Sequence, residues 1–199
     1  NVLAETSAAG TVQRYYVNGA GYVDERVLLH DNAGAGTDHY YLLSDLFTIA
    51  GLANADGLVT EAYRYDAFGG ARVYDPASPA VELGKSPRGN PYFFTGRWTD
   101  KLGGPSPSQV VSLTDHRART YDPLHGRWLQ RDPKGYVDGM SLYEYLRSSP
   151  MSFSDPFGSQ SAGADAIPGL GPPPDPRTAR IKEALSALRR DREVIALDA

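Results

Sequence analysis

The stretch Thr114-Asp-His-Arg-Ala-Arg-Thr-Tyr-Asp-Pro-Leu-His-Gly-Arg-Trp-Leu-Gln-Arg-Asp-Pro-Lys-Gly135 holds a series of turn signals between short β-rich runs. It ends in an Asp-Pro-x-Gly box at residues 132–135, and a second box follows at residues 155–158. In such a box the Asp side chain accepts hydrogen bonds from backbone N–H groups, Pro presets φ, and Gly takes a conformation that other residues resist. Two boxes in this arrangement predict short strands held together by rigid turns.

The residues before this stretch are typical of antiparallel β-hairpins. Runs at 11–17 and 22–29 are rich in β-forming residues and are separated by Asn18-Gly19, a strong hairpin signal. Further strands are predicted at residues 39–43, 58–65 and 71–75. Alternation in the second of these places four side chains on one face, namely Val59, Glu61, Tyr63 and Tyr65. The pair Tyr-Asp recurs at strand ends, where Asp opens the next turn, so the segment is a degenerate strand–turn repeat.

Seven segments carry further structural predictions. Residues 75–90 are rich in Pro, Gly and Ser and predict a loop, and residues 90–98 predict a buried strand. Residues 110–113 and 117–121 are expected to pair as strands, and residues 142–146 to form one helical turn. From Ser159 the composition changes to a Pro/Gly-rich linker, and the apolar periodicity of residues 177–190 predicts a short amphipathic helix.

Composition excludes several classes of site. The chain has 21 Gly, 15 Pro and 13 Tyr, a mixture that suits short strands and tight turns. It has no Cys, which excludes disulfides, thiolate metal sites and a cysteine nucleophile. No pair of its four histidines has ligand spacing on a predicted helix, so we expect no metal and no cofactor. No run approaches the ~18 apolar residues of a membrane span. The start at Asn1, without Met, favours a processed or truncated product.

The charge of the chain does not predict a nucleic-acid-binding surface. The formal net charge is −4, and the basic residues of the central stretch are interleaved with acidic ones. Four arginines form a basic cluster there: Arg117, Arg119, Arg127 and Arg131. We expect this cluster to bind the segment's own carboxylates and carbonyls.

The ordered series of motifs resembles the Rhs repeat-associated core of Rhs and YD-repeat proteins, the large β-shells relevant to bacterial polymorphic toxins and teneurins. Four motifs carry the resemblance: Asn90-Pro-Tyr-Phe-Phe-Thr-Gly96, Arg117-Ala-Arg-x-Tyr-Asp-Pro-x-x-Gly-Arg-Trp128, Leu142-Tyr-x-Tyr145 and the two Asp-Pro-x-Gly boxes. Three departures stand out. Trp128 lies where Phe is common, Ser148-Ser149 replaces the usual Asn-Asn, and Ser159 replaces the usual Leu.

The resemblance implies an all-β fold in which an antiparallel β-hairpin strip ends in an inward-curling core plug, with a short C-terminal helix. It divides the chain into YD-repeat hairpins at 1–75, the Rhs core at 76–158, and the linker and helix at 159–199. It also implies that the partners are the remainder of the shell, from the same or other chains, and the chain's own C-terminal segment as cargo. The location is then secreted or on the bacterial cell surface. A strip this short leaves unpaired sheet edges, so we expect it to join a longer β-structure.

The same resemblance implies intramolecular aspartyl self-cleavage. The catalytic pair becomes Asp132 and Asp155, with Arg131 alongside, and the cut falls near Ser159-Gln160. Two carboxylates held close share a proton, so that one activates water while the other polarises the scissile carbonyl. From the residues alone, the alternative is that both Asp side chains only cap their turns. The functional alternative is a non-catalytic structural or adhesive YD-repeat protein, because the 41 residues after Gly158 are too few for a toxin enzyme.

Overall fold

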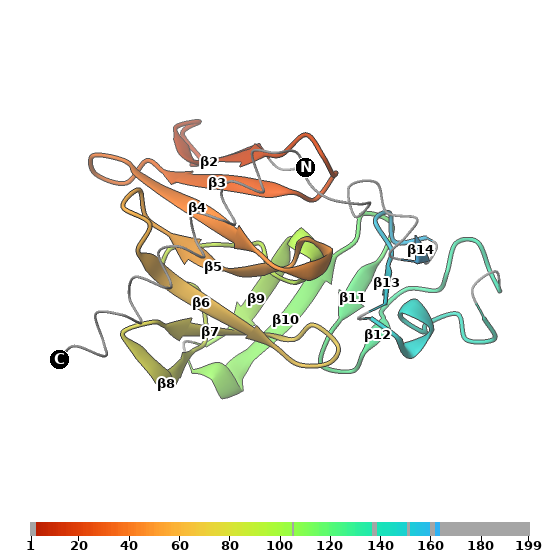
Figure 1. Ribbon diagram of the computed structural model, residues 1–199. Coiled ribbons are helices and arrows are strands. Elements are labelled where there is room, and N and C mark those ends of the chain that lie inside the picture. The colour runs from red at the N-terminus through yellow and green to blue at the C-terminus, as the bar shows by residue number, and fades with distance from the viewer. Residues whose placement is uncertain (1–2, 105, 137–138, 151, 160–161, 164–199) are drawn as a thin grey trace.

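The computed structural model describes residues 3–104, 106–136, 139–150, 152–159 and 162–163. Within these ranges the chain consists of antiparallel β-strands and four short 3-10 turns, with no α-helix, which confirms the all-β prediction (Figure 1). No helix in this part of the chain is long and apolar enough to cross a membrane. The predicted linker and the helix at 177–190 lie outside the described residues.

The first half of the chain forms one eight-stranded sheet in which each strand pairs with the next along the sequence. Its strands are β1 (Ala4–Thr6), β2 (Val12–Asn18), β3 (Arg26–Asp31), β4 (Thr37–Leu43), β5 (Ile49–Ala53), β6 (Val59–Tyr65), β7 (Ala71–Asp75) and β8 (Ser78–Leu83). All the predicted strands of this half are present. Connections of a few residues, most of them containing Asn, Asp or Gly, join successive strands, so neighbours in sequence are neighbours in the sheet.

One face of this sheet is buried. Its core contains Tyr16, Leu29, Tyr41, Ile49, Leu52, Tyr63 and Val73, and it is covered by Tyr92 and Phe93 from the segment after β8. Alternation along β6 places Glu61 and Tyr63 in this core as predicted, whereas Val59 remains 38% exposed at the strand end. The Glu61 carboxylate tolerates burial because it accepts hydrogen bonds from Tyr63 Oη at 2.6 Å, Ser86 Oγ at 2.8 Å and the Arg88 N–H at 2.8 Å.

The second half forms two smaller sheets beside the first (Figure 1). One has the order β12-β11-β10-β9, with β9 (Thr99–Gly103), β10 (Val110–Asp115), β11 (Thr120–Asp122) and β12 (Arg127–Trp128). The other pairs β13 (Phe153–Ser154) with β14 (Ala162–Gly163). The 3-10 turns are η1 (Asp45–Phe47), η2 (Phe94–Gly96), η3 (Pro107–Gln109) and η4 (Leu146–Ser148). A second core of aromatic side chains lies here, made of Phe94, Tyr121, Trp128, Tyr145 and Leu146.

Five local predictions are wrong or incomplete. Residues 110–113 pair with β9 and not with 117–121, because β10 pairs with β11 only at Thr114 and Asp115. The predicted loop at 75–90 contains β8, whose Pro79 is tolerated because β8 lies at the edge of the described sheet. The predicted strand at 90–98 is instead the turn η2, in which Thr95 has φ 49° and Tyr92 bridges to Trp98. The hairpin at Asn18-Gly19 opens into a longer connection that reaches β3 only at Arg26. The predicted turn at 142–146 begins only at Leu146, as η4.

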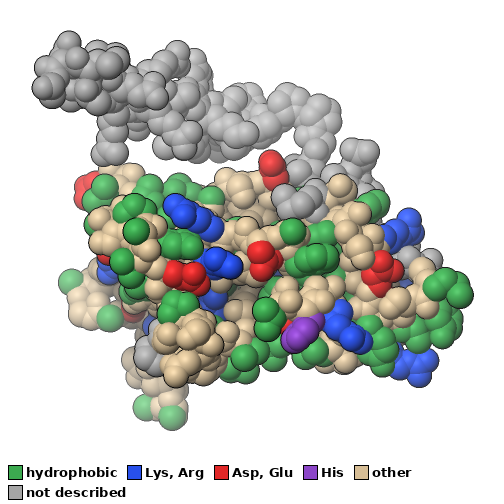
Figure 2. Space-filling model, turned by 90° about the horizontal axis from the view of Figure 1, so that it is seen from below, with side chains coloured by type: hydrophobic (Ala, Val, Ile, Leu, Met, Phe, Trp, Pro, Cys, Tyr) green, Lys and Arg blue, Asp and Glu red, His purple; other side chains and the backbone are tan. Residues whose placement is uncertain are grey.

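The surface mixes side-chain types. Figure 2 shows acidic and basic side chains interspersed with apolar ones over one face of the molecule. Several apolar side chains of the strands are exposed, among them Val81 of β8 at 53%. An edge strand with an exposed apolar side chain and free backbone groups is suited to pairing with another strand.

Candidate functional site

Arg119 lies at the centre of the segment that carries both Asp-Pro-x-Gly boxes. Its side chain is 4% exposed and packs over the Trp128 ring, with Cζ 4.1 Å from the ring centroid. Nη1 lies 2.8 Å from Oδ2 of Asp132, and Nη2 lies 3.2 Å from Oδ2 of Asp155. The third donor, Nε, binds the Gly158 carbonyl at 2.6 Å. One guanidinium therefore joins both predicted catalytic carboxylates to the backbone carbonyl next to the predicted cut.

Each Asp uses its two oxygens for different tasks. Oδ1 of Asp132 accepts from the Lys134 N–H at 2.8 Å, which caps the first box. Oδ1 of Asp155 accepts from the N–H groups of Phe157 at 3.3 Å and Ser159 at 3.1 Å, which caps the second. The Oδ2 atoms remain for Arg119. Turn capping and the contacts with Arg119 are thus compatible, because different oxygens of each carboxylate serve them.

A small cavity adjoins these groups. It has a volume of about 10 Å³, and its lining includes Arg119, Trp128, Asp132 and Asp155. A cavity of this size holds roughly one water molecule when it offers polar partners. The side chains of Asp132 and Asp155 are 8% and 2% exposed. The site is therefore nearly closed to bulk solvent, and its carboxylates are held by fixed donors.

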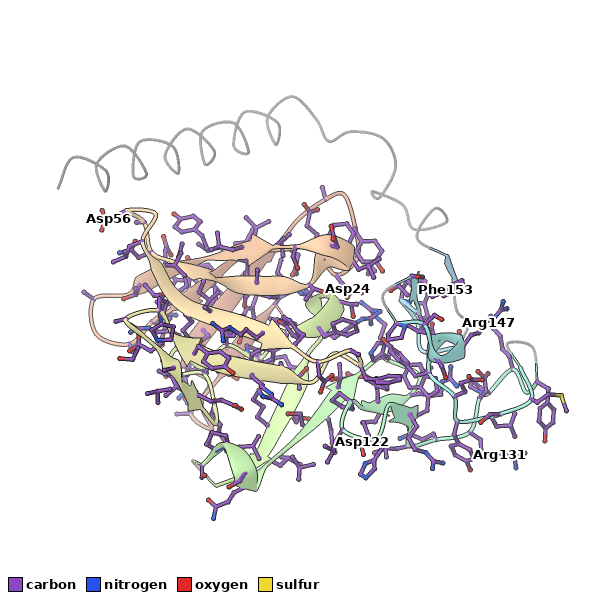
Figure 3. All side chains as sticks on the ribbon, turned by 60° about the horizontal axis from the view of Figure 1, so that its bottom comes forward. Asp24, Asp56, Asp122, Arg131, Arg147 and Phe153 are labelled. Atoms are coloured by element: carbon purple, nitrogen blue, oxygen red, sulfur yellow. The ribbon has the colours of Figure 1, made fainter. Side chains whose placement is uncertain are left out.

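The basic cluster divides into different environments. Arg119 binds carboxylates and a carbonyl, as expected for the cluster. Arg131 is exposed, and Figure 3 shows it at the periphery of the segment, so the structure does not bring it to the carboxylates by any contact among the described residues. Arg97, which the sequence did not single out, is 2% exposed and donates from Nη2 to the Asp155 carbonyl at 3.1 Å. The sequence feature that could have identified Arg97 is its position directly after the Phe-Thr-Gly motif.

His116 packs behind the second box. Its Nδ1 lies 3.2 Å from the Asp155 carbonyl oxygen, and its ring contacts Tyr121, Trp128 and Tyr145 edge-on. Burial lowers the pKa of His116 well below its ordinary value, and the charge of Arg97 lowers it further, so the imidazole is neutral. Since the carbonyl can only accept, Nδ1 carries the proton. His116 thus holds the backbone of Asp155 and has no charge to offer the site.

No group of three or more His, Cys, Asp or Glu side chains in the described ranges could hold a metal ion. The groups that the described structure brings together here are two carboxylates, one guanidinium and a small cavity.

The two glycines of the boxes allow a matched test of this geometry. Both have left-handed φ, 69° at Gly158 and 74° at Gly135. A Cβ at Gly158 would lie 2.4 Å from the His116 carbonyl oxygen, whereas a Cβ at Gly135 would meet nothing within 4 Å. We expect Gly135→Ala to lower the free energy of unfolding by about 1–2 kcal/mol through backbone strain. Gly158→Ala should cost about 1–3 kcal/mol more through overpacking. Urea unfolding of both variants measures this, and equal losses would contradict the close approach at Gly158.

Comparison with known proteins relates the chain to toxin subunits. No family model matches it. Toxin subunit YenC2 of Yersinia entomophaga is 33% identical over 105 residues, which are 53% of this chain and 9% of that protein. Toxin subunit YenC1 of the same organism is 29% identical over 119 residues, or 59% of this chain and 11% of that protein. The chain is thus similar to part of much longer toxin subunits, which supports the Rhs and YD-repeat resemblance at a coarse level.

A solved structure shares the fold. The crystal structure of TcdB2-TccC3-TEV matches 77% of this chain and 7% of that chain, with a TM-score of 0.53 and 20% sequence identity. The match supports the all-β architecture.

Proposed function

We propose that the chain is the closure module of a larger β-shell and that it cleaves its own backbone near Ser159. In this proposal Asp132 and Asp155 form the aspartyl pair, and Arg119 orients both carboxylates and the peptide to be cut. The observation that carries the proposal is the guanidinium of Arg119, which contacts both Oδ2 atoms and the Gly158 carbonyl oxygen. If Asp132 and Asp155 only capped their turns, their Oδ1 contacts would suffice, and that role would not require the three contacts of Arg119.

The chemistry follows from the charges. Two carboxylates and one guanidinium carry a net charge of −1 when all are ionised, and one shared proton neutralises the group. The unprotonated carboxylate removes a proton from the enclosed water while the water oxygen adds to the carbonyl carbon. For a cut at Gly158–Ser159, Arg119 stabilises the oxyanion that forms on Gly158, because its Nε already donates to that oxygen. The protonated carboxyl then gives its proton to the leaving nitrogen, the C–N bond breaks, and a new carboxylate and a new amine result.

Two adjacent peptides are candidates for the cut. The peptide that the described site contacts is Gly158–Ser159, whose N–H donates to Asp155 Oδ1 and whose carbonyl accepts from Arg119. The resemblance places the cut one residue later, between Ser159 and Gln160, and Gln160 lies outside the described residues. Sequencing the new amino terminus distinguishes the two.

The test is an incubation of the chain at mildly acidic pH, followed by intact-mass measurement over time. We expect the 21.6 kDa chain to give a fragment of about 4 kDa, scaled from the residues after the cut. The rate constant should not change when the protein is diluted, since the reaction is intramolecular. A rate that falls on dilution would indicate a contaminating protease or cleavage between molecules. An intact chain after prolonged incubation would contradict self-cleavage.

The proposal extends to the assembly. In the described sheet, β1 and β8 each pair on one side only, so both leave an edge for further strands. We propose that these edges join the remainder of the shell, in the same or other chains, and that residues 1–75 and 76–158 act as repeat and core. The segment from Ser159 is then the cargo, and the location is secreted or on the bacterial cell surface.

A non-catalytic structural or adhesive role is the second candidate. The observation that favours it is that Oδ1 of each Asp caps its own turn, so both residues already stabilise the fold. Absence of cleavage in the incubation, with the fold intact, would leave this role.

A further inference from the structure

Asp24 is a buried carboxylate far from the two boxes in sequence. It lies in the connection between β2 and β3 and is 1% exposed. Three guanidinium groups surround it: Arg26 at 3.4 Å, Arg97 at 3.0 Å and Arg117 at 2.7 Å. Figure 3 places Asp24 at the side of the large sheet that faces the segment with Phe153 and Arg147. It therefore lies where the two halves of the described chain meet.

Two of these arginines also bind the second Asp-Pro-x-Gly box. Nη2 of Arg97 donates to the Asp155 carbonyl at 3.1 Å and to Asp24 Oδ2 at 3.0 Å. Nη1 of Arg117 donates to the Pro156 carbonyl, while its Nη2 binds Asp24 Oδ1. Each arginine thus forms a bridge from Asp24 to a backbone carbonyl within the box. The next carbonyl along, that of Phe157, accepts from the Ala118 N–H at 3.2 Å.

The charges make these bridges depend on Asp24. One carboxylate faces three guanidinium groups, of which Arg26 and Arg97 are almost fully buried. Removal of a buried charge leaves its partners uncompensated, and they then move apart or draw in water. Burial lowers the pKa of Arg97, and the negative charge of Asp24 is the largest influence that raises this pKa again. Arg117 also has a left-handed backbone, φ 69°, which the surrounding contacts hold in place.

We infer that Asp24 is a positioning residue for the cleavage near Ser159, and that it makes cleavage depend on docking of the β2–β3 hairpin against the second box. The inference rests on the proposed self-cleavage. Asp24 contacts neither Gly158 nor the carboxylates of Asp132 and Asp155 by any described hydrogen bond, so it acts through Arg97 and Arg117. A chain whose repeat hairpin has not yet docked would hold the box loosely and would remain uncut.

The test compares Asp24→Asn with Glu25→Gln in the whole chain. Glu25 is the adjacent residue of the same connection, and its carboxylate accepts from the Gly21 N–H, a contact that Gln retains. Both variants remove one negative charge. We expect Asp24→Asn to lower the first-order rate constant of cleavage at least about 10-fold. A small displacement of the peptide to be cut relative to the two carboxylates lowers a rate constant by this factor or more. Glu25→Gln should cleave at the parental rate.

Hydrogen exchange supplies a second readout. The amides of Phe157 and Ser159 are bound to Asp155 Oδ1 and report on the box itself. Measured in an Asp132→Asn background, in which cleavage is expected to be slow, their exchange should be at least about 10-fold faster in Asp24→Asn than in Glu25→Gln.

A double-mutant cycle separates positioning from a general loss of stability. The Arg117 side chain is 31% exposed, so Arg117→Gln should fold even if Asp24→Asn does not. Because Asp24 and Arg117 act on the box through one linkage, the double variant should be slowed less than the product of the two single effects. Where Asp24→Asn does not fold, Arg117→Gln alone must slow cleavage and speed exchange at residues 157–159.

The outcomes are distinct. Slow cleavage and fast exchange confined to Asp24→Asn or Arg117→Gln support the inference. A folded Asp24→Asn that cleaves at the parental rate overturns it and leaves self-cleavage standing, and multiplicative effects in the cycle also overturn it. A parental chain that never cleaves contradicts the proposed function and, with it, this role of Asp24.

Discussion

Asp132→Asn and Asp155→Asn are each expected to lower the first-order rate constant of cleavage by about 10²–10⁴-fold, the range for loss of a general acid or base. Asn cannot take a proton from water or return one to the leaving nitrogen. It keeps a carbonyl oxygen that can still cap each turn, as Oδ1 does for the Lys134 and Ser159 amides. Intact-mass time courses of both variants measure the loss, and their urea unfolding midpoints show whether the fold survives.

The matched control is Asp122→Asn. Asp122 also precedes a proline and caps its turn, with Oδ1 accepting from the Leu124 N–H at 3.0 Å, but it has no contact with Arg119 among the described residues. The Asp122→Asn variant should therefore cleave at the parental rate. If all three variants were slowed alike, turn rigidity and not paired carboxylates would be the property that cleavage requires.

Arg119→Gln is the second substitution for which we expect a large effect, on both the cleavage rate and the stability of the fold. Loss of one charged donor at a developing oxyanion lowers the rate by about 10²–10³-fold. The substitution also leaves Asp132 and Asp155 as buried carboxylates without their shared cation, which costs about 3–5 kcal/mol of unfolding free energy. Rate constants and urea unfolding therefore need to be measured together, at temperatures where the variant is folded.

Arg131→Gln is the control, and it also tests the role that the resemblance implies for Arg131. Arg131 is exposed and adjoins Asp132 in sequence, whereas Arg119 binds Asp132 in space. If Arg119 is the arginine that matters, Arg131→Gln cleaves at the parental rate. Loss of cleavage in Arg131→Gln with an intact fold would instead support the role expected from the resemblance.

The hairpins were predictable because their determinants are local. Alternation and turn residues specify β6 and β7, and the Asp66 carboxylate caps the turn between them through the Phe68 and Gly70 amides. The failures were places where distant contacts decide. The segment that was predicted as a strand at 90–98 turns sharply at Thr95 because its backbone N–H binds Thr48 Oγ1, 47 residues earlier.

The candidate site likewise has some features set by neighbouring residues and others set by distant contacts. Local residue patterns predicted the two Asp-Pro-x-Gly turns, whose caps depend on neighbouring residues. The resemblance, through its order of motifs, singled out Asp132 and Asp155 as a pair, and the residues alone left both as turn caps. The resemblance named Arg131, whereas the described contacts to both carboxylates come from Arg119. Arg119 meets Asp155 across 36 positions, and Arg117 meets Asp24 across 93. These pairings depend on the folded chain, because a guanidinium binds whichever carboxylate or carbonyl the backbone brings within about 3 Å of it.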